Sequence, residues 1–126
     1  MKFRLLLSVA LFLSTAAAFG QGPAYPYSVA LTWTVSVTGT VTGQNVYRAP
    51  WALPSGPCGT FAKINAAPLA ASATSSTDST VVPGGAYCYA VTAIAPAPAG
   101  ESGLSNIVQN VQIPPAPPTG LAGVVD

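Results

Sequence analysis

The sequence contains no histidine and very few charged side chains. Among its 126 residues there are four Lys and Arg and three Asp and Glu. The absence of histidine excludes metal sites built on imidazole, and it excludes nucleophiles activated by a histidine base within this chain. So few cations cannot neutralise a row of phosphates or form a polybasic patch for anionic lipid. We therefore expect no nucleic-acid binding.

The three carboxylates are too widely spaced to predict acid–base catalysis. Asp78 falls in an expected strand, Glu101 in an expected loop, and Asp126 at the last position given. A carboxylate pair that cleaves a glycosidic bond must converge on that bond, whereas the first two flank an expected strand on different elements. The glycines also lack the spacing of a phosphate-binding loop. We expect a protein that is not an enzyme, with no cofactor and no metal.

No stretch of the sequence is apolar for long enough to cross a bilayer. The longest apolar run, residues 5–13, follows Lys2 and Arg4 and precedes three alanines at 16–18. A basic segment, a short apolar segment and small residues in this order are typical of a secretory signal peptide. We expect residues 1–20 to be this signal, with cleavage after Ala18 or Gly20. The mature chain is then secreted, periplasmic or at the cell surface, with no membrane insertion.

Thirteen prolines and twelve glycines argue against long helices. Residues 28–37 and 87–93 instead alternate with a period of two, with large apolar residues on one parity and small or hydroxyl residues on the other. Each pattern predicts a strand with one buried and one exposed face. The core residues that these and neighbouring segments predict are Val29, Leu31, Trp33, Val46, Tyr89 and Val91.

Shorter segments complete an all-β pattern of one domain. A polar residue, Gln44, falls on the inner parity of the second strand, so it needs a hydrogen-bond partner or a place near the strand end. A ten-residue connection precedes the last strand, which forms a hairpin with residues 87–93. The additional expected strands are residues 44–49, 61–64, 77–81 and 107–113.

Residues 81–105 resemble the part of a fibronectin type III module from the turn before its F strand to the loop after it. The residues that carry the resemblance are Val81, Pro83, Gly84, Tyr87, Tyr89, Val91, Ala93, Gly100, Glu101, Ser102 and Ser105, and Leu31 with Trp33 resembles the B strand. The resemblance implies an immunoglobulin-like β-sandwich over residues 21–113, with its A strand short or missing. It also implies a tyrosine corner, in which the Tyr87 hydroxyl bonds to the backbone just upstream.

The two cysteines are expected in an oxidising compartment because a signal peptide precedes them. Parity places Cys88 on the outer face of its strand, opposite Tyr87 and Tyr89. In the fold that the chain resembles, residues 44–49 lie antiparallel beside this strand, which brings the loop that carries Cys58 near its start. We expect a Cys58–Cys88 disulfide, with two free thiols or intermolecular pairing as the alternatives.

The candidate binding surface consists of Tyr47, Trp51 and Glu101. Tyr47 has outward parity, and the other two lie in expected loops. Such residues suit an unknown protein or polysaccharide, although each aromatic can instead cover a loop or edge locally. The function we expect is a non-catalytic secreted or envelope module for interaction. The alternative is a passive spacer or a fragment of a multi-module extracellular protein, for example one that carries a carbohydrate-active enzyme.

Residues 114–126 are expected to be a proline-rich linker or the start of a further module. The proline run predicts a stiff, extended spacer, and residues 119–125 resemble an A strand without a module of its own. We expect this tail to be disordered or to dock on an open sheet edge by strand addition. The protein is expected to be a monomer, with a strand-addition dimer as the alternative.

Overall fold

The computed structural model describes residues 27–126, so the expected signal peptide over residues 1–20 lies outside the described residues. The described part forms no helix, and hence none that could cross a membrane. All of its regular structure is β. The strands are β1 (Val29–Thr32), β2 (Gly43–Pro50), β3 (Ala62–Lys63), β4 (Ser75–Asp78), β5 (Ala86–Ala95), β6 (Gly100–Glu101) and β7 (Val108–Gln112).

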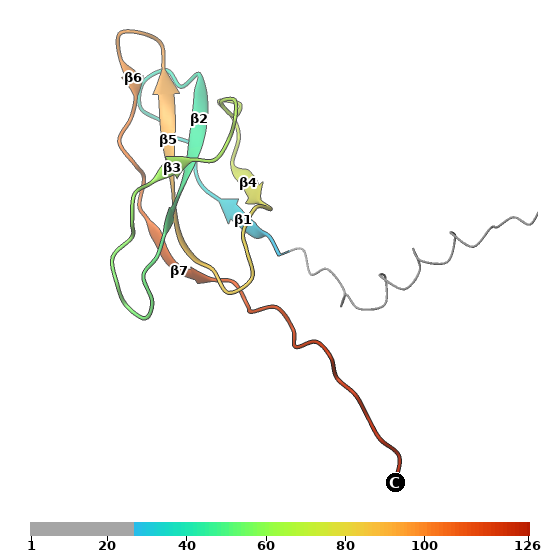
Figure 1. Cartoon of the computed structure of the whole chain (residues 1–126). Coiled ribbons are helices and arrows are strands. Elements are labelled where there is room, and N and C mark those ends of the chain that lie inside the picture. The colour runs from blue at the N-terminus through green and yellow to red at the C-terminus, as the bar shows by residue number, and fades with distance from the viewer. Residues whose placement is uncertain (1–26) are drawn as a thin grey trace, which may run out of the picture. The chain divides into compact units, whose positions relative to one another are not determined.

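These strands form two antiparallel sheets within one compact unit, Pro26–Pro115. In the first sheet β1 pairs with β4. In the second the order is β3–β2–β5, and both β6 and β7 pair with β5. The central strands β2 and β5 lie side by side along the full length of β2 (Figure 1). The arrangement is all-β and consistent with a β-sandwich. Residues 116–126 fall in a different unit and contain no strand.

Strand β1 is shorter than the sequence predicts. It ends at Thr32, and only the Trp33 N–H continues the ladder, by donating to the Thr74 carbonyl. Val37, expected on the inner parity, is 91% exposed, so the expected strand over residues 28–37 is wrong beyond this point. The reason is that residues 69–73 leave β1 and hydrogen-bond to β2 instead.

The buried Gln44 side chain binds this departing segment. Its Oε1 accepts a hydrogen bond from the Trp33 indole N–H at 2.6 Å. Its amide nitrogen lies within hydrogen-bonding distance of the carbonyl oxygens of Ala70, Ala71 and Ala73. The expectation that a polar residue on the inner parity needs a partner is confirmed. One side chain thus connects β2, the end of β1 and the turn before β4.

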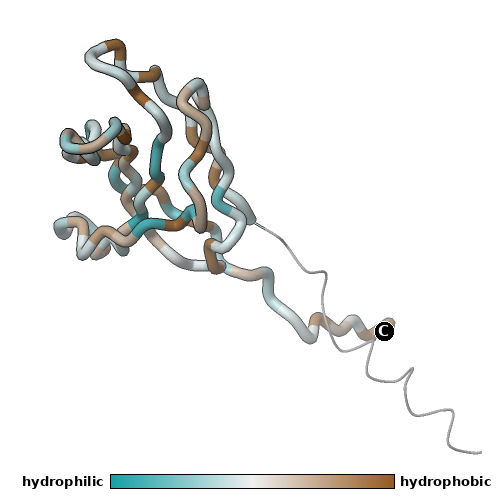
Figure 2. The backbone as a smooth tube through the Cα atoms, turned by 90° about the horizontal axis from the view of Figure 1, so that it is seen from above, coloured by the Kyte–Doolittle hydropathy of each residue, from teal (hydrophilic) through white to brown (hydrophobic). Residues whose placement is uncertain are grey.

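The expected core is confirmed fully for two of its members. Val46 and Tyr89 are buried, whereas the other four expected core residues are only partly buried: Val29, Leu31, Trp33 and Val91. Strands β1 and β4 have only four residues each, so the smaller sheet leaves these side chains partly accessible. Hydrophobic and hydrophilic residues alternate along much of the backbone (Figure 2).

The outer face of β5 is buried, contrary to the sequence prediction. Cys88 is 0% exposed, and Ala90 and Thr92 are buried as well. The loop between β2 and β3 covers the start of this face, because Cys58 in that loop is bonded to Cys88 with 6.0 Å between their Cα atoms. The predicted disulfide is therefore present. A second apolar cluster forms around it from Ala49, Trp51, Cys88, Cys58, Phe61 and Ala86.

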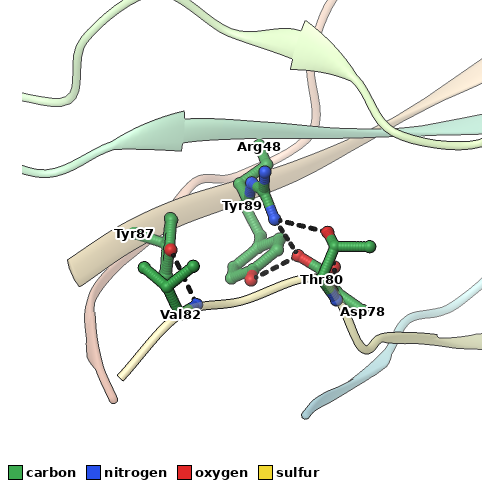
Figure 3. A network of polar contacts seen from close by, with 6 residues as sticks. All are labelled: Arg48, Asp78, Thr80, Val82, Tyr87 and Tyr89. Carbon is green, nitrogen blue, oxygen red and sulfur yellow. Dashed lines mark hydrogen bonds and ion pairs between the residues drawn. The ribbon is translucent and has the colours of Figure 1, made fainter. Parts of the chain in front are cut away.

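On the inner face, the carboxylate of Asp78 links the two sheets (Figure 3). One oxygen accepts hydrogen bonds from Arg48 and from the Tyr89 hydroxyl, both at 2.8 Å. The other accepts from the backbone N–H and the hydroxyl of Thr80. Burial alone would raise the pKa of this carboxyl, but the hydrogen bonds from Thr80, Tyr89 and Arg48 outweigh it and lower the pKa. Asp78 is thus a buried and fully paired anion.

Tyr87 lies beside this network and closes the turn before β5. Its hydroxyl accepts a hydrogen bond from the Val82 N–H at 3.2 Å, within the upstream segment that the sequence predicts. The Arg48 guanidinium stacks over the ring, 4.9 Å from its centroid. A Cβ at Gly85 would lie 2.6 Å from this hydroxyl, so the turn needs glycine there. The Tyr87 ring is only half-buried.

The two neighbouring tyrosine hydroxyls allow a matched comparison. Tyr89→Phe removes a buried bond to a carboxylate and should lower the free energy of unfolding by about 1.5–3 kcal/mol. Tyr87→Phe removes a more exposed bond to a backbone N–H and should cost about 0.5–1.5 kcal/mol. Urea denaturation of both variants measures the difference. Equal losses, or a larger loss for Tyr87→Phe, would contradict the assignment of Asp78 as the central acceptor.

The disulfide should contribute strongly to stability, because it closes a loop with a sequence separation of 30. Loop-closure entropy gives about 3–4 kcal/mol for a loop of this length. We expect the double variant Cys58→Ala, Cys88→Ala to lose that amount in urea denaturation. The control is alkylation of the denatured, non-reduced wild-type protein, which should label no thiol. Two labelled thiols would show that the bridge does not form in solution.

Candidate functional site

The candidate site is a polar cluster on the outer face of the five-stranded sheet. Asn45 of β2 lies opposite Thr92 of β5, and Glu101 of β6 lies opposite Ile94 of β5. Alternate residues of a strand share a face, so Tyr47 joins the same group. Three strands therefore bring these polar side chains together, beyond the end of the apolar cluster around the disulfide.

A single oxygen of Glu101 is the centre of this cluster. Its Oε1 accepts hydrogen bonds from the Asn45 amide at 3.0 Å, the Tyr47 hydroxyl at 2.6 Å and the Thr92 hydroxyl at 2.5 Å. The Oε2 atom has no hydrogen-bond partner among residues 27–126. The carboxylate is thus held in one orientation with an acceptor oxygen left for a ligand, while the Glu101 residue remains exposed.

The donors around Glu101 are themselves held in place. The Asn65 amide donates to Asn45 Oδ1 at 2.9 Å and to the Ala67 carbonyl at 2.8 Å. Its own Oδ1 accepts the backbone N–H of Val46 at 2.8 Å. Because each amide has partners on both ends, the Asn45 side chain has little freedom to turn away from Glu101. The site is therefore preorganised by the segment that follows β3.

Hydrogen bonding fixes the protonation states of the site. Bonds from Asn45, Thr92 and Tyr47 lower the pKa of Glu101 to about 2. The same contact raises the pKa of Tyr47, whose hydroxyl donates a hydrogen bond to the carboxylate. At neutral pH the site is a carboxylate beside a neutral phenol. Such a pair can accept hydrogen bonds from ligand hydroxyls or attract a cation, but it offers no proton in the neutral range.

The structure does not pair this carboxylate with Asp78. Asp78 contacts Arg48 and Tyr89 on the inner face, whereas Glu101 contacts Asn45, Tyr47 and Thr92 on the outer face. Within residues 27–126, no three His, Cys, Asp or Glu side chains gather as a metal site would require.

Of the three residues predicted for a binding surface, Tyr47 and Glu101 lie together in the structure, whereas Trp51 lies outside their cluster. Trp51 is 9% exposed and packs in the cluster around the disulfide. The predicted role of Trp51 in ligand contact is wrong, because its N–H donates to the Ala86 carbonyl, which continues the β2–β5 ladder and places its side chain in this cluster. The indole N–H of Trp51 has no acceptor within the described part of the chain.

Sequence reasoning missed Asn45 and Thr92 as members of the site. Both have outward parity on their strands, so the period of two could have placed them on the same face as Tyr47. Nothing local in the sequence shows that β6 pairs with the end of β5. That pairing carries Glu101 back over the sheet and completes the site.

The lowered pKa of Glu101 predicts a dependence of stability on acid. A carboxyl whose pKa falls on folding stabilises the fold above its unfolded pKa, and this contribution is lost as the pH falls through the folded pKa. The melting temperature should therefore decrease as the pH is lowered from 4.5, the reference pKa, to about 2, the pKa of Glu101 in the folded protein. Glu101→Gln should show a smaller decrease than wild type over this window, measured by circular dichroism.

A charge-matched control separates the cluster from a general effect of net charge. Asp126→Asn also removes one carboxylate, but at an exposed position in the unit that holds residues 116–126. We expect Asp126→Asn to keep more of the acid sensitivity of wild type than Glu101→Gln does. If the two variants respond alike, the hydrogen bonds to Glu101 do not stabilise the fold.

Comparison with known proteins gives this site no precedent. No protein-family model matches the chain, and no curated protein does. The feature of the outer face that bears on function is the Glu101 carboxylate, which three donors hold in place.

Proposed function

We propose that the protein is a non-catalytic, fibronectin type III-like module that acts outside the cell or in its envelope. The topology supports this proposal, because the pair β1–β4 would correspond to the B and E strands, and β3, β2, β5 and β7 to C′, C, F and G. The contact between Tyr87 and Val82 supports it further. The Cys58–Cys88 disulfide is compatible with an extracellular location.

The observation that carries a binding role is the orientation of Glu101. A carboxylate with three donors on one oxygen costs little further entropy when its other oxygen accepts a ligand. The adjoining Tyr47 side chain offers an aromatic surface and is only partly buried. An ionised acceptor beside an aromatic ring suits the hydroxyls and the apolar face of a sugar. We therefore favour a polysaccharide over a protein as the ligand.

The alternative is a passive spacer in a multi-module protein. The proline-rich segment that follows β7 supports this reading, because four prolines within residues 114–118 keep a chain extended. A spacer has no need of a fixed and exposed carboxylate, and this is why we place the binding role first.

Binding to insoluble polysaccharides tests the proposal. Wild-type protein is incubated with cellulose, chitin and peptidoglycan, and the bound fraction is measured after sedimentation. If one of them binds, Glu101→Gln should weaken the affinity by roughly tenfold or more, because a hydrogen bond to a charged group contributes about 1.5–3 kcal/mol. Tyr47→Ala should weaken the same interaction. Melting temperatures at neutral pH show whether each variant is folded.

Asp126→Asn serves as the charge-matched control and should bind like wild type. A wild-type protein that binds none of the three polysaccharides would favour the spacer. An affinity unchanged by both Glu101→Gln and Tyr47→Ala would show that the outer face is not the binding surface, even if the protein binds.

A further inference from the structure

The edge of β1 that faces away from β4 has no strand partner in the described part of the chain. The hydrogen bond from the Trp33 N–H to the Thr74 carbonyl shows which residues of β1 direct their backbone groups toward β4. In an antiparallel pair, the residues that bond to the partner alternate with residues whose backbone groups point the other way. The N–H and C=O groups of Ala30, Thr32 and Thr34 therefore point toward the open edge, and no hydrogen bond to them is found within residues 27–126.

A groove runs beside this open edge. It has a volume of about 490 Å³, with Thr32, Trp33 and Thr34 on one wall and Ser102, Gly103 and Ser105 on the other. A smaller pocket of about 50 Å³ shares Thr32, Trp33 and Ser105 with it and is lined by apolar groups of Leu31, Val91 and Val108. The open edge thus offers unpaired backbone, and the small pocket beside the groove offers apolar surface, which is what an added strand requires.

The tail of the same chain has the properties of such a strand. Leu121 is 99% and Val125 98% exposed, and residues 116–126 form no strand. In an extended conformation these two side chains share one face, and Ala122 and Val124 share the other. Hydrophobic residues are visible in this segment close to the labelled C-terminus (Figure 2). Its unpaired backbone and exposed apolar side chains match the unpaired edge and apolar pocket at β1.

We propose that residues 119–125 of one copy of the chain add as a strand to the open edge of β1 in a second copy. The backbone of the tail would pair with Ala30 and Thr32, and Leu121 and Val125 would lie against Trp33 and Val91, which line both the groove and the small pocket. Each copy carries one tail and one open edge, so the exchange closes as a dimer or continues as a head-to-tail chain.

The direction of the chain explains why the partner is a second copy. The beginning of β7, at Val108, lines the small pocket together with Leu31 and Trp33. Further on, the Pro115 carbonyl accepts a hydrogen bond from the Tyr27 hydroxyl, which lies before the start of β1. The segment from β7 to Pro115 therefore runs opposite to β1. To follow its own β1, the tail would have to reverse within residues 114–118, where four prolines favour an extended chain.

Sedimentation velocity over a range of concentrations tests this inference on the full chain. We expect wild-type protein to self-associate reversibly. The double variant Leu121→Asp, Val125→Asp should weaken association at least tenfold, because it places charges against the apolar side chains beside the open edge. The matched control Ala122→Asp, Val124→Asp adds the same charge on the opposite face of the tail and should keep most of the association. Thr32→Pro, which removes an N–H from the open edge only, should also weaken association.

Three results would overturn the proposal. Wild-type protein that remains a monomer at high concentration would show that the edge is not used by a second copy. Equal association of the two charged tail variants would show that no one face of the tail enters a groove. A deletion of residues 119–126 that lowers the melting temperature of a monomer by several degrees would show that the tail pairs within its own chain. None of these outcomes bears on polysaccharide binding at Glu101, which lies on the outer sheet face.

Discussion

The buried carboxylate of Asp78 is the interaction on which the arrangement of the two sheets depends. It lies at the end of β4 and accepts hydrogen bonds from Arg48 of β2 and Tyr89 of β5, so a single group connects the smaller sheet to the two central strands of the larger one. A buried anion is tolerated only when it is paired and its lone pairs are satisfied. Thr80 supplies the remaining donors from the next turn. The sheets can therefore pack only in the register that brings these residues together.

Strand β5 is covered on both faces, which is unusual for a small antiparallel protein with few apolar residues of large size. Its inner face meets the end of β4 through the hydrogen bond from the Tyr89 hydroxyl to Asp78. Its outer face receives the loop that the Cys58–Cys88 bridge holds down, and further along it receives Glu101. The disulfide and its loop thus cover one end of the outer face, and the other end holds a group of polar side chains in which Glu101 is exposed and Tyr47 partly buried.

The two proposals use different parts of the domain and support each other functionally. Polysaccharide contact is assigned to the outer face around Glu101, and self-association to the open edge of β1. Joining several copies through their tails would present several Glu101 sites on one particle. A repeating ligand such as a polysaccharide would bind such an assembly with higher overall affinity, since a second binding event on a linked copy becomes effectively intramolecular. A module with modest affinity for each site can then remain attached.

Sequence alone was sufficient for the features that depend on local pattern. The period of two located the strand around Tyr89, and the resemblance of residues 81–105 to a known β-sandwich module implied the bond of the Tyr87 hydroxyl to the upstream backbone and the strand adjacency from which Cys58 and Cys88 were predicted to pair. These features depend on neighbouring residues or on strands that are adjacent in the fold. Parity also predicted that Gln44 would need a hydrogen-bond partner. It could not predict that the side-chain amide donates to the backbone carbonyl groups of residues 70, 71 and 73.

Tertiary structure decided everything that depends on how distant segments meet. The alternating pattern of β1 continues to Val37, but the strand ends at Thr32 because its partner segment turns toward Gln44. Trp51 falls in a proline-rich loop like an exposed aromatic, yet its backbone bond to Ala86 extends the β2–β5 ladder and brings it into a buried cluster. Glu101 stands in a loop by sequence, and only its pairing across β5 places it among three donors. A local pattern fixes which face a side chain takes on its own strand, whereas the contacts made by that face depend on free energies summed over the whole chain.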